Sequence, residues 1–147
     1  MYKRILMPLD GSPRSEQTLG WGLDFAAALA AEVTFLHVLE TPANGLYNLP
    51  TGALYLQDIV RDLRAAGKAV LENAKAQAAA AGVTCDAYLL EDAGPAHAIL
   101  EAEKAHHLTV MGTHGRRGLN RALLGSVTER VLRQSSKPHL VVRCPKA

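Results

Sequence analysis

Hydrophobic residues along this chain alternate between short continuous runs and longer stretches with helical spacing. The short apolar runs are typical of buried strands, and they cover residues 3–9, 33–39, 83–90, 108–112 and 139–144. Between them, apolar positions recur every three or four residues, which predicts amphipathic helices over residues 13–31, 53–81, 95–107 and 126–135. Strict alternation of strand and helix predicts a doubly wound α/β fold, in which helices cover both faces of a parallel sheet.

Local signals support several of these boundaries. Ser12 is suited to cap the first helix and Pro13 to occupy its first turn, while Gly82 is well placed to end the second helix. The connection over residues 40–52 is longer and rich in turn residues. With 147 residues and neither an internal repeat nor a linker, the chain is expected to form a single domain over residues 1–147.

Composition narrows the class of protein. No apolar run approaches the length of a membrane span, and the first residues lack the apolar core of a signal peptide. Cys85 and Cys144 are too few and too far apart for a disulfide framework or a zinc site. We therefore expect a cytoplasmic protein without a membrane partner, in which both thiols are free.

Charge is distributed unevenly along the chain. Residues 1–111 carry 8 Lys and Arg against 13 Asp and Glu, a balance of −5, whereas residues 112–147 carry 8 against 1, a balance of +7. This asymmetry favours an anionic partner near the C-terminal end, either a phosphate-bearing small molecule or a nucleic acid.

Two turns of unusual composition follow predicted strands, at residues 8–12 (PLDGS) and 111–115 (MGTHG). In open parallel sheets, ligands bind beyond the carboxyl ends of the strands, where the strand order reverses. If the first and fourth strands are neighbours, both turns face one crevice. The first turn would contribute Asp10, whose carboxylate suits ribose hydroxyls but equally suits an Asx-turn with Gly11 and Ser12.

The second turn begins the spacing Gly112-x2-Gly115-x9-Gly125-Ser126. Glycines let the backbone approach a ligand closely, and the free N–H groups at the start of a helix favour an anion. Together the two groups of N–H donors predict a polyphosphate site. An alternative for Ser126 is a purely structural cap, because Ser126 and Glu129 fit the capping-box pattern; Gly125 and Ser126 would still offer their N–H groups.

Other signatures are absent or accidental. Gly67-Lys68 lacks the rest of a P-loop, and the GxG at residues 20–22 lies inside a predicted helix. His106 and His107 have no metal-ligand spacing and are expected to be solvated at a helix end, and His114 has no visible catalytic partner. At the end of the second strand, the backbone of His37 and Val38 suits an adenine edge as well as ordinary strand pairing.

The stretches KRILMPLDGSPRSEQTL, VTFLHVL and LTVMGTHGRRGLNRALLGSVTERVLRQSSKPHLVVR resemble the universal stress protein (UspA) family along essentially the whole chain. The glycine spacing is similar to that of the ATP-binding branch of the family. This resemblance implies a five-stranded parallel sheet of order 3-2-1-4-5, of the adenine nucleotide alpha hydrolase-like, Rossmann-like type. It also implies a homodimer that forms through the last strand.

The resemblance also implies a nucleotide site. Asp10 matches the ribose-binding residue, Pro8 lines the same turn together with Leu9, and the backbone of Val38 matches the contact to adenine. The ribose and phosphate loops match Met111, Gly112, Gly115, Arg116, Gly125, Ser126 and Val127. A Mg²⁺ or Mn²⁺ ion would be held by the phosphates. His107 stands where the family often has Asp, at the far end of the strand from the site.

These observations predict a protein that binds ATP as a regulatory ligand in the stress response and is not an enzyme, with at most slow ATP hydrolysis. One alternative is an adenylyl-transferring enzyme on the same fold, although the turn after the first strand lacks the Ser-Gly-Gly type of pyrophosphate loop. Another is a nucleic-acid-binding module, but every Tyr, Phe and Trp precedes residue 90, so the basic segment offers no stacking platform.

Overall fold

The computed structural model describes residues 1–41, 52–91, 93–113 and 124–143. Five strands form one sheet in the order β3-β2-β1-β4-β5, and all neighbouring pairs are parallel. The strands are β1 Arg4–Pro8, β2 Glu32–Val38, β3 Cys85–Leu90, β4 Leu108–Gly112 and β5 His139–Val142. The predicted fold class and strand order are confirmed.

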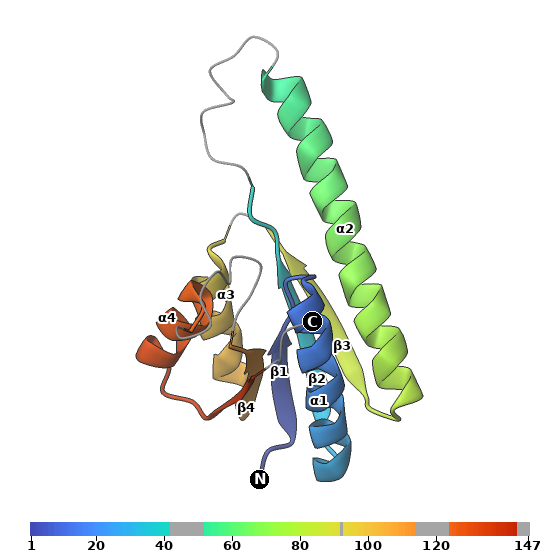
Figure 1. The fold of residues 1–147 in the computed structure, drawn as a ribbon, viewed down its shortest axis with the longest axis vertical. Helices are drawn as coiled ribbons and strands as arrows, with labels where there is room; N and C mark the ends of the chain where they lie inside the picture. The colour runs from blue at the N-terminus through green and yellow to red at the C-terminus, as the bar shows by residue number, and fades with distance from the viewer. Residues whose placement is uncertain (42–51, 92, 114–123, 144–147) are drawn as a thin grey trace.

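Two helices cover each face of the sheet. Helices α1 (Pro13–Leu29) and α2 (Gly52–Ala80) lie on one face, and α3 (Pro95–Ala102) and α4 (Ser126–Gln134) lie on the other (Figure 1). Because parallel strands need a crossover connection, the alternation seen in the sequence leads directly to this layered arrangement. The predicted helix over residues 95–107 is shorter than expected: after Ala102 the chain continues as a 3₁₀ turn, η2 (Glu103–Ala105).

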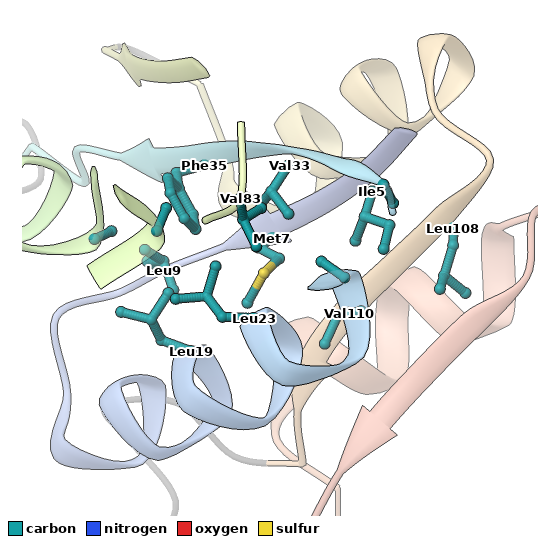
Figure 2. Close-up of a cluster of buried hydrophobic side chains, with 14 of the residues drawn as sticks. Ile5, Met7, Leu9, Leu19, Leu23, Val33, Phe35, Val83, Leu108 and Val110 are labelled. Carbon is teal, nitrogen blue, oxygen red and sulfur yellow. The ribbon is translucent and has the colours of Figure 1, made fainter. Parts of the chain in front are cut away.

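Alternate side chains of each strand enter two separate cores. Ile5 and Met7 of β1 point toward α1 and α2, and the larger core on this side also contains Val33, Phe35 and Val110 (Figure 2). On the other face, a smaller core is formed by Leu6, Leu36, Met111, Ala96, Ile99 and Val131. Burial on both faces explains why the strands are continuous apolar runs in the sequence.

The edge strand β3 is an exception to this double burial. Its residues alternate, with Cys85, Ala87 and Leu89 packed against the larger core, while Tyr88 and Leu90 on the opposite face are 55% and 38% exposed. The face of β3 opposite α2 is therefore open to solvent. Within the described ranges, no helix is both long and apolar enough to cross a membrane.

The prediction that His106 and His107 are solvated is wrong. Both residues are only partly exposed, and Nδ1 and Nε2 of His106 lie 2.7 Å from the Ala102 carbonyl oxygen and 2.8 Å from the Thr34 hydroxyl. Nδ1 of His107 accepts the backbone N–H of Arg4. The contacts with Thr34 and Arg4 join residues that lie 72 and 103 positions apart in the chain, which no local pattern reveals.

Candidate functional site

The carboxyl ends of β2, β1 and β4 lie side by side at one edge of the sheet. The turn over residues 8–12 begins at Pro8, the last residue of β1, and Thr113 follows β4, so the condition that β1 and β4 are neighbours is confirmed. Helix α4 begins at this same edge, since Thr128 in its first turn contacts Gly112 at the end of β4. The edge is therefore the candidate functional site.

The turn after β1 is held by a network of short-range hydrogen bonds. The Asp10 carboxylate accepts the Ser12 N–H at 2.9 Å, and the Asp10 N–H donates to the Ser15 hydroxyl at 3.2 Å. Ser12 caps α1 by accepting the Ser15 N–H, and Pro13 occupies the first turn of the helix, as predicted. Gly11 has φ of 80°, a left-handed conformation that favours glycine.

The Asx-turn alternative for Asp10 is therefore confirmed. It does not conflict with a contact to ribose, because a carboxylate offers several acceptor positions. The turn fixes the orientation of Asp10 at the carboxyl edge, where the side chain is half-buried. Pro8 beside it is also half-buried, whereas the side chain of Leu9 belongs to the larger core.

The turn after β4 is closed at its base by three hydrogen bonds. The Thr113 carbonyl accepts a hydrogen bond from the Gly125 N–H at 2.7 Å, and the Thr113 N–H donates to the Val142 carbonyl at 3.0 Å. The Thr128 hydroxyl donates to the Gly112 carbonyl at 2.8 Å. These bonds fix the start of α4 to the ends of β4 and β5.

Two expectations about the start of α4 are corrected by this geometry. The Gly125 N–H is not available to a ligand, because it bonds to Thr113. Ser126 is not the cap of α4: Gly125 occupies the N-cap position without any side-chain hydrogen bond, and Ser126 is the first helical residue and is exposed. The capping-box pattern of Ser126 and Glu129 is therefore not realised in the structure.

The backbone N–H groups at the start of α4 remain at the site. The first N–H to bond back along the helix is that of Glu129, to the Gly125 carbonyl at 2.9 Å. The N–H groups of Ser126, Val127 and Thr128 precede it and lie at the positive end of the helix dipole. The Val127 side chain packs against the smaller core, so a contact of Val127 with a ligand would run through its backbone. The Met111 side chain lies in the same core, and Met111 pairs with Val141 of β5.

Val38 lies at the end of β2, on the far side of β1 from α4. The pairing of β1 with β2 ends at Pro8 and Leu36, so Val38 has no partner residue on β1. The carbonyl of Leu9 instead lies 2.7 Å from Nδ1 of the buried His37. Pairing with β1 therefore does not occupy the backbone N–H and C=O of Val38.

Not every predicted site residue can be located. Gly115 and Arg116 lie outside the described residues. The structure also adds residues that sequence reasoning missed as parts of the site. These are the His37 side chain, Thr113 and Thr128, whose contacts with Leu9, Gly125 and Gly112 are not encoded in any local spacing.

A family model described as the universal stress protein family matches residues 1–143. The chain belongs to this family. The universal stress protein MJ0531 of Methanocaldococcus jannaschii is 36% identical and aligns with 99% of this chain and 85% of its own length. The solved structure of the hypothetical protein MJ0577 has a TM-score of 0.85 and 30% identity, covering 100% of this chain and 99% of that one.

Another solved relative is a universal stress protein in complex with cAMP. It has a TM-score of 0.68 and 23% identity, and the match covers 97% of both chains. At this level of identity the likeness supports the shared fold. Membership of the family is consistent with the order of strands and with the turn positions described above.

Proposed function

We propose that this protein binds an adenine nucleotide, ATP in the first instance, and uses it as a regulatory ligand in the stress response. One observation carries the proposal: the Val38 backbone, Asp10 and the start of α4 lie in that order on the adjacent ends of β2, β1 and β4. Two strand spacings amount to about 10 Å. That distance suits a nucleotide whose base, ribose and phosphates each meet one of these groups.

The chemistry of each group matches the part of the nucleotide assigned to it. A backbone N–H and C=O pair complements the adjacent acceptor and donor of adenine, and a carboxylate accepts hydrogen bonds from ribose hydroxyls. The N–H groups and dipole at the start of α4 favour phosphate. A related universal stress protein was solved in complex with cAMP, which is consistent with a site for adenine nucleotides in this family.

Mg²⁺, or Mn²⁺ in its place, is proposed to accompany the phosphates rather than to occupy a protein cage. Over the described residues, no group of three His, Cys, Asp or Glu side chains is arranged to hold a metal ion. The ion would neutralise phosphate charge that the helix dipole offsets only in part. Removal of the metal is therefore expected to weaken ATP binding more than AMP binding.

In this proposal the nucleotide is bound and not turned over. The Asp10 carboxylate accepts the Ser12 N–H and is assigned to the ribose, at some distance from the phosphates. The Glu129 carboxylate in the first turn of α4 is paired with Arg133. A nucleophilic water would need a base near the phosphates. An assay of phosphate release from ATP is expected to show at most slow turnover.

Isothermal titration calorimetry with ATP and Mg²⁺ tests the proposal directly. The expected result is one saturable site per chain, with much weaker binding of CTP as the matched control. The ultraviolet absorbance ratio of freshly purified protein would reveal a co-purified nucleotide. No heat of binding with ATP, ADP or AMP in nucleotide-free protein would overturn the proposal.

We further propose a homodimer that pairs the β5 strands of two copies. Strand β5 is the last in the sheet order, and each of its four residues is half-buried. An edge strand presents unpaired N–H and C=O groups, which a second copy can satisfy. Light scattering is expected to give twice the mass of the chain.

A further inference from the structure

The hydrogen-bond ladder between β1 and β2 stops one step before Val38. In a parallel ladder, a residue of one strand donates to one residue of its neighbour and accepts from the residue two positions further on. The Leu9 N–H donates to the Leu36 carbonyl at 2.8 Å, so the next bond would run from the Val38 N–H to the Leu9 carbonyl. The last paired residues are Pro8 and Leu36, and that next bond is not made.

The side chain of His37 takes the place of the missing bond. Its Nδ1 lies 2.7 Å from the Leu9 carbonyl oxygen. Because a carbonyl oxygen only accepts hydrogen bonds, Nδ1 carries the proton and donates it. The imidazole ring is 3% exposed and lies on the face of the sheet that α2 covers. The ring thus donates to the Leu9 carbonyl from the face of the sheet that α2 covers.

The His37 bond, made in place of the ladder bond, changes which backbone groups of Val38 lie open at the edge of the sheet. A residue in a strand directs its N–H and C=O to the same neighbour, so the Val38 pair points past the end of β1. The Leu9 carbonyl accepts the hydrogen bond of His37, and no bond holds the Val38 N–H in the ladder. The donor and acceptor of Val38 are left side by side at the edge, next to Asp10 of the neighbouring strand end.

We propose that His37 is a positioning residue that keeps the Val38 backbone out of the β1–β2 ladder so that it recognises the edge of adenine. This inference rests on the proposed function. The Val38 N–H donates to N1 of adenine, and the Val38 C=O accepts from the 6-amino group. Hypoxanthine carries a hydrogen on N1 and an oxygen at C6, which reverses both partners. His37 therefore sets base specificity without touching the base.

Helix α2 holds the His37 ring in place. Gly67 of α2 lies so close to the ring that a Cβ atom at this position would be 2.8 Å from Cδ2 of His37 and 2.9 Å from Cδ1 of Leu89. A side chain of any size at Gly67 would push the ring from its position. Gly67 therefore provides a second, independent way to disturb the bond between His37 and Leu9.

The test compares His37→Leu, which lacks the donor, with His37→Asn, whose amide nitrogen can reach the position of Nδ1. The first measurement is hydrogen exchange of the Val38 amide in nucleotide-free protein, followed by NMR. Fast exchange is expected in the wild type and in His37→Asn, and at least tenfold slower exchange in His37→Leu, because the Val38 N–H then bonds to the Leu9 carbonyl. Equal exchange in all three proteins would overturn the inference.

The second measurement is the affinity for AMP and for IMP by calorimetry. The wild type and His37→Asn are expected to prefer AMP by about tenfold or more, since two hydrogen bonds are at stake. In His37→Leu, AMP binding is expected to weaken by about tenfold while IMP binding stays the same. A purely structural histidine would instead weaken both ligands equally and leave their ratio unchanged, which contradicts the inference.

Gly67→Ala keeps the test valid if His37→Leu does not fold. Displacement of the ring is expected to lower the preference for AMP, whereas Gly20→Ala, at an exposed position of α1 where a Cβ meets nothing within 4 Å, should leave it unchanged. If the wild type binds neither AMP nor IMP, the proposed function fails. In that case, slow exchange of the Val38 amide in His37→Leu would still show that His37 keeps Val38 out of the ladder. Only the link between His37 and adenine would be refuted.

Discussion

The hydroxyl of Thr128 donates a hydrogen bond of 2.8 Å to the carbonyl oxygen of Gly112, which joins the first turn of α4 to the end of β4. Thr128 is 4% exposed, so this bond is shielded from water. Its position makes it a side-chain link between the strand end and the helix start at the proposed phosphate position.

Thr128→Val removes this bond and leaves the Gly112 carbonyl without its side-chain donor. A buried polar group that loses its partner costs about 1–3 kcal/mol, so the free energy of unfolding should fall by that amount. Urea denaturation measures the change. Thr128→Ser retains the hydroxyl and should lose less than Thr128→Val. Equal losses in both variants would mean that the methyl group, and not the hydrogen bond, accounts for the effect.

Ser126→Ala should weaken ATP binding about ten- to hundredfold, because a hydrogen bond to a charged group contributes about 1.5–3 kcal/mol. The structure sharpens this prediction: Ser126 is exposed and Gly125 is the N-cap, so the hydroxyl does not cap α4. Stability should therefore change by less than about 0.5 kcal/mol. Calorimetry and urea denaturation on the same preparation separate the two effects. Full ATP affinity in Ser126→Ala would remove the hydroxyl from the proposed site.

Val141→Pro should convert the proposed dimer into a monomer. The carbonyls of Pro138 and Val142 accept bonds from Thr109 of β4 and from Thr113 just after it. The intervening odd-numbered residues of β5 therefore direct their N–H groups to the open edge. Proline at position 141 removes an edge donor without breaking the ladder to β4. Light scattering checks the mass, and circular dichroism checks that the fold is kept. A dimer that persists with an intact fold would place the interface elsewhere.

Thr109→Val should raise stability by about 1 kcal/mol or more. Thr109 is fully buried in β4, and in the described structure its hydroxyl oxygen has no hydrogen-bond partner. Valine has nearly the same shape and removes an unsatisfied polar group. Thr18→Val is the matched control, since the Thr18 hydroxyl donates to the Arg14 carbonyl at 3.0 Å. That variant should lose stability, and a loss in both would contradict the prediction for Thr109.

Cys85 should react slowly with alkylating reagents near pH 8. Burial, assisted by the nearby Asp86 carboxylate, raises the pKa of the Cys85 thiol, although Lys75 acts in the opposite direction. The thiolate is the reactive form, so fewer molecules are reactive at a given pH. A Cys144→Ser chain isolates the reaction, and a cysteine-containing peptide is the reference. A rate equal to that of the peptide would show that the thiol is not shielded.

The same shift has a consequence for stability. Above the ordinary pKa of a cysteine, the thiol of the unfolded chain loses its proton, while the Cys85 thiol of the folded chain, with its raised pKa, still holds it. Rising pH therefore favours the unfolded state. The free energy of unfolding should thus decline above about pH 8.5, and this part of the decline should vanish in Cys85→Ala.

Much of the fold follows from local patterns. The start of α1 at Ser12 and Pro13 and the bounds of β4 agree with the sequence-based predictions, because capping chemistry and continuous hydrophobic runs act over only a few residues. The helix over residues 95–107 and the cap at Ser126 were predicted less well. Both errors lie at helix ends, where the bond of Glu103 in η2 to Ser135 and the bond of Gly125 to Thr113 override the local signal.

The amino-acid sequence alone was sufficient for the order of strands and helices, for the family resemblance and for the carboxyl edge as the place of the site. Hydrophobic periodicity and glycine spacing are properties of neighbouring residues, which is why they can be interpreted without a structure. Only the tertiary structure decided which backbone groups that edge presents. The Gly125 N–H is bonded to Thr113, and the Leu9 carbonyl is bonded to a histidine of the next strand, which sets Val38 apart from the ladder. Such bonds join residues that are distant in sequence, and they form only when the strands pack together.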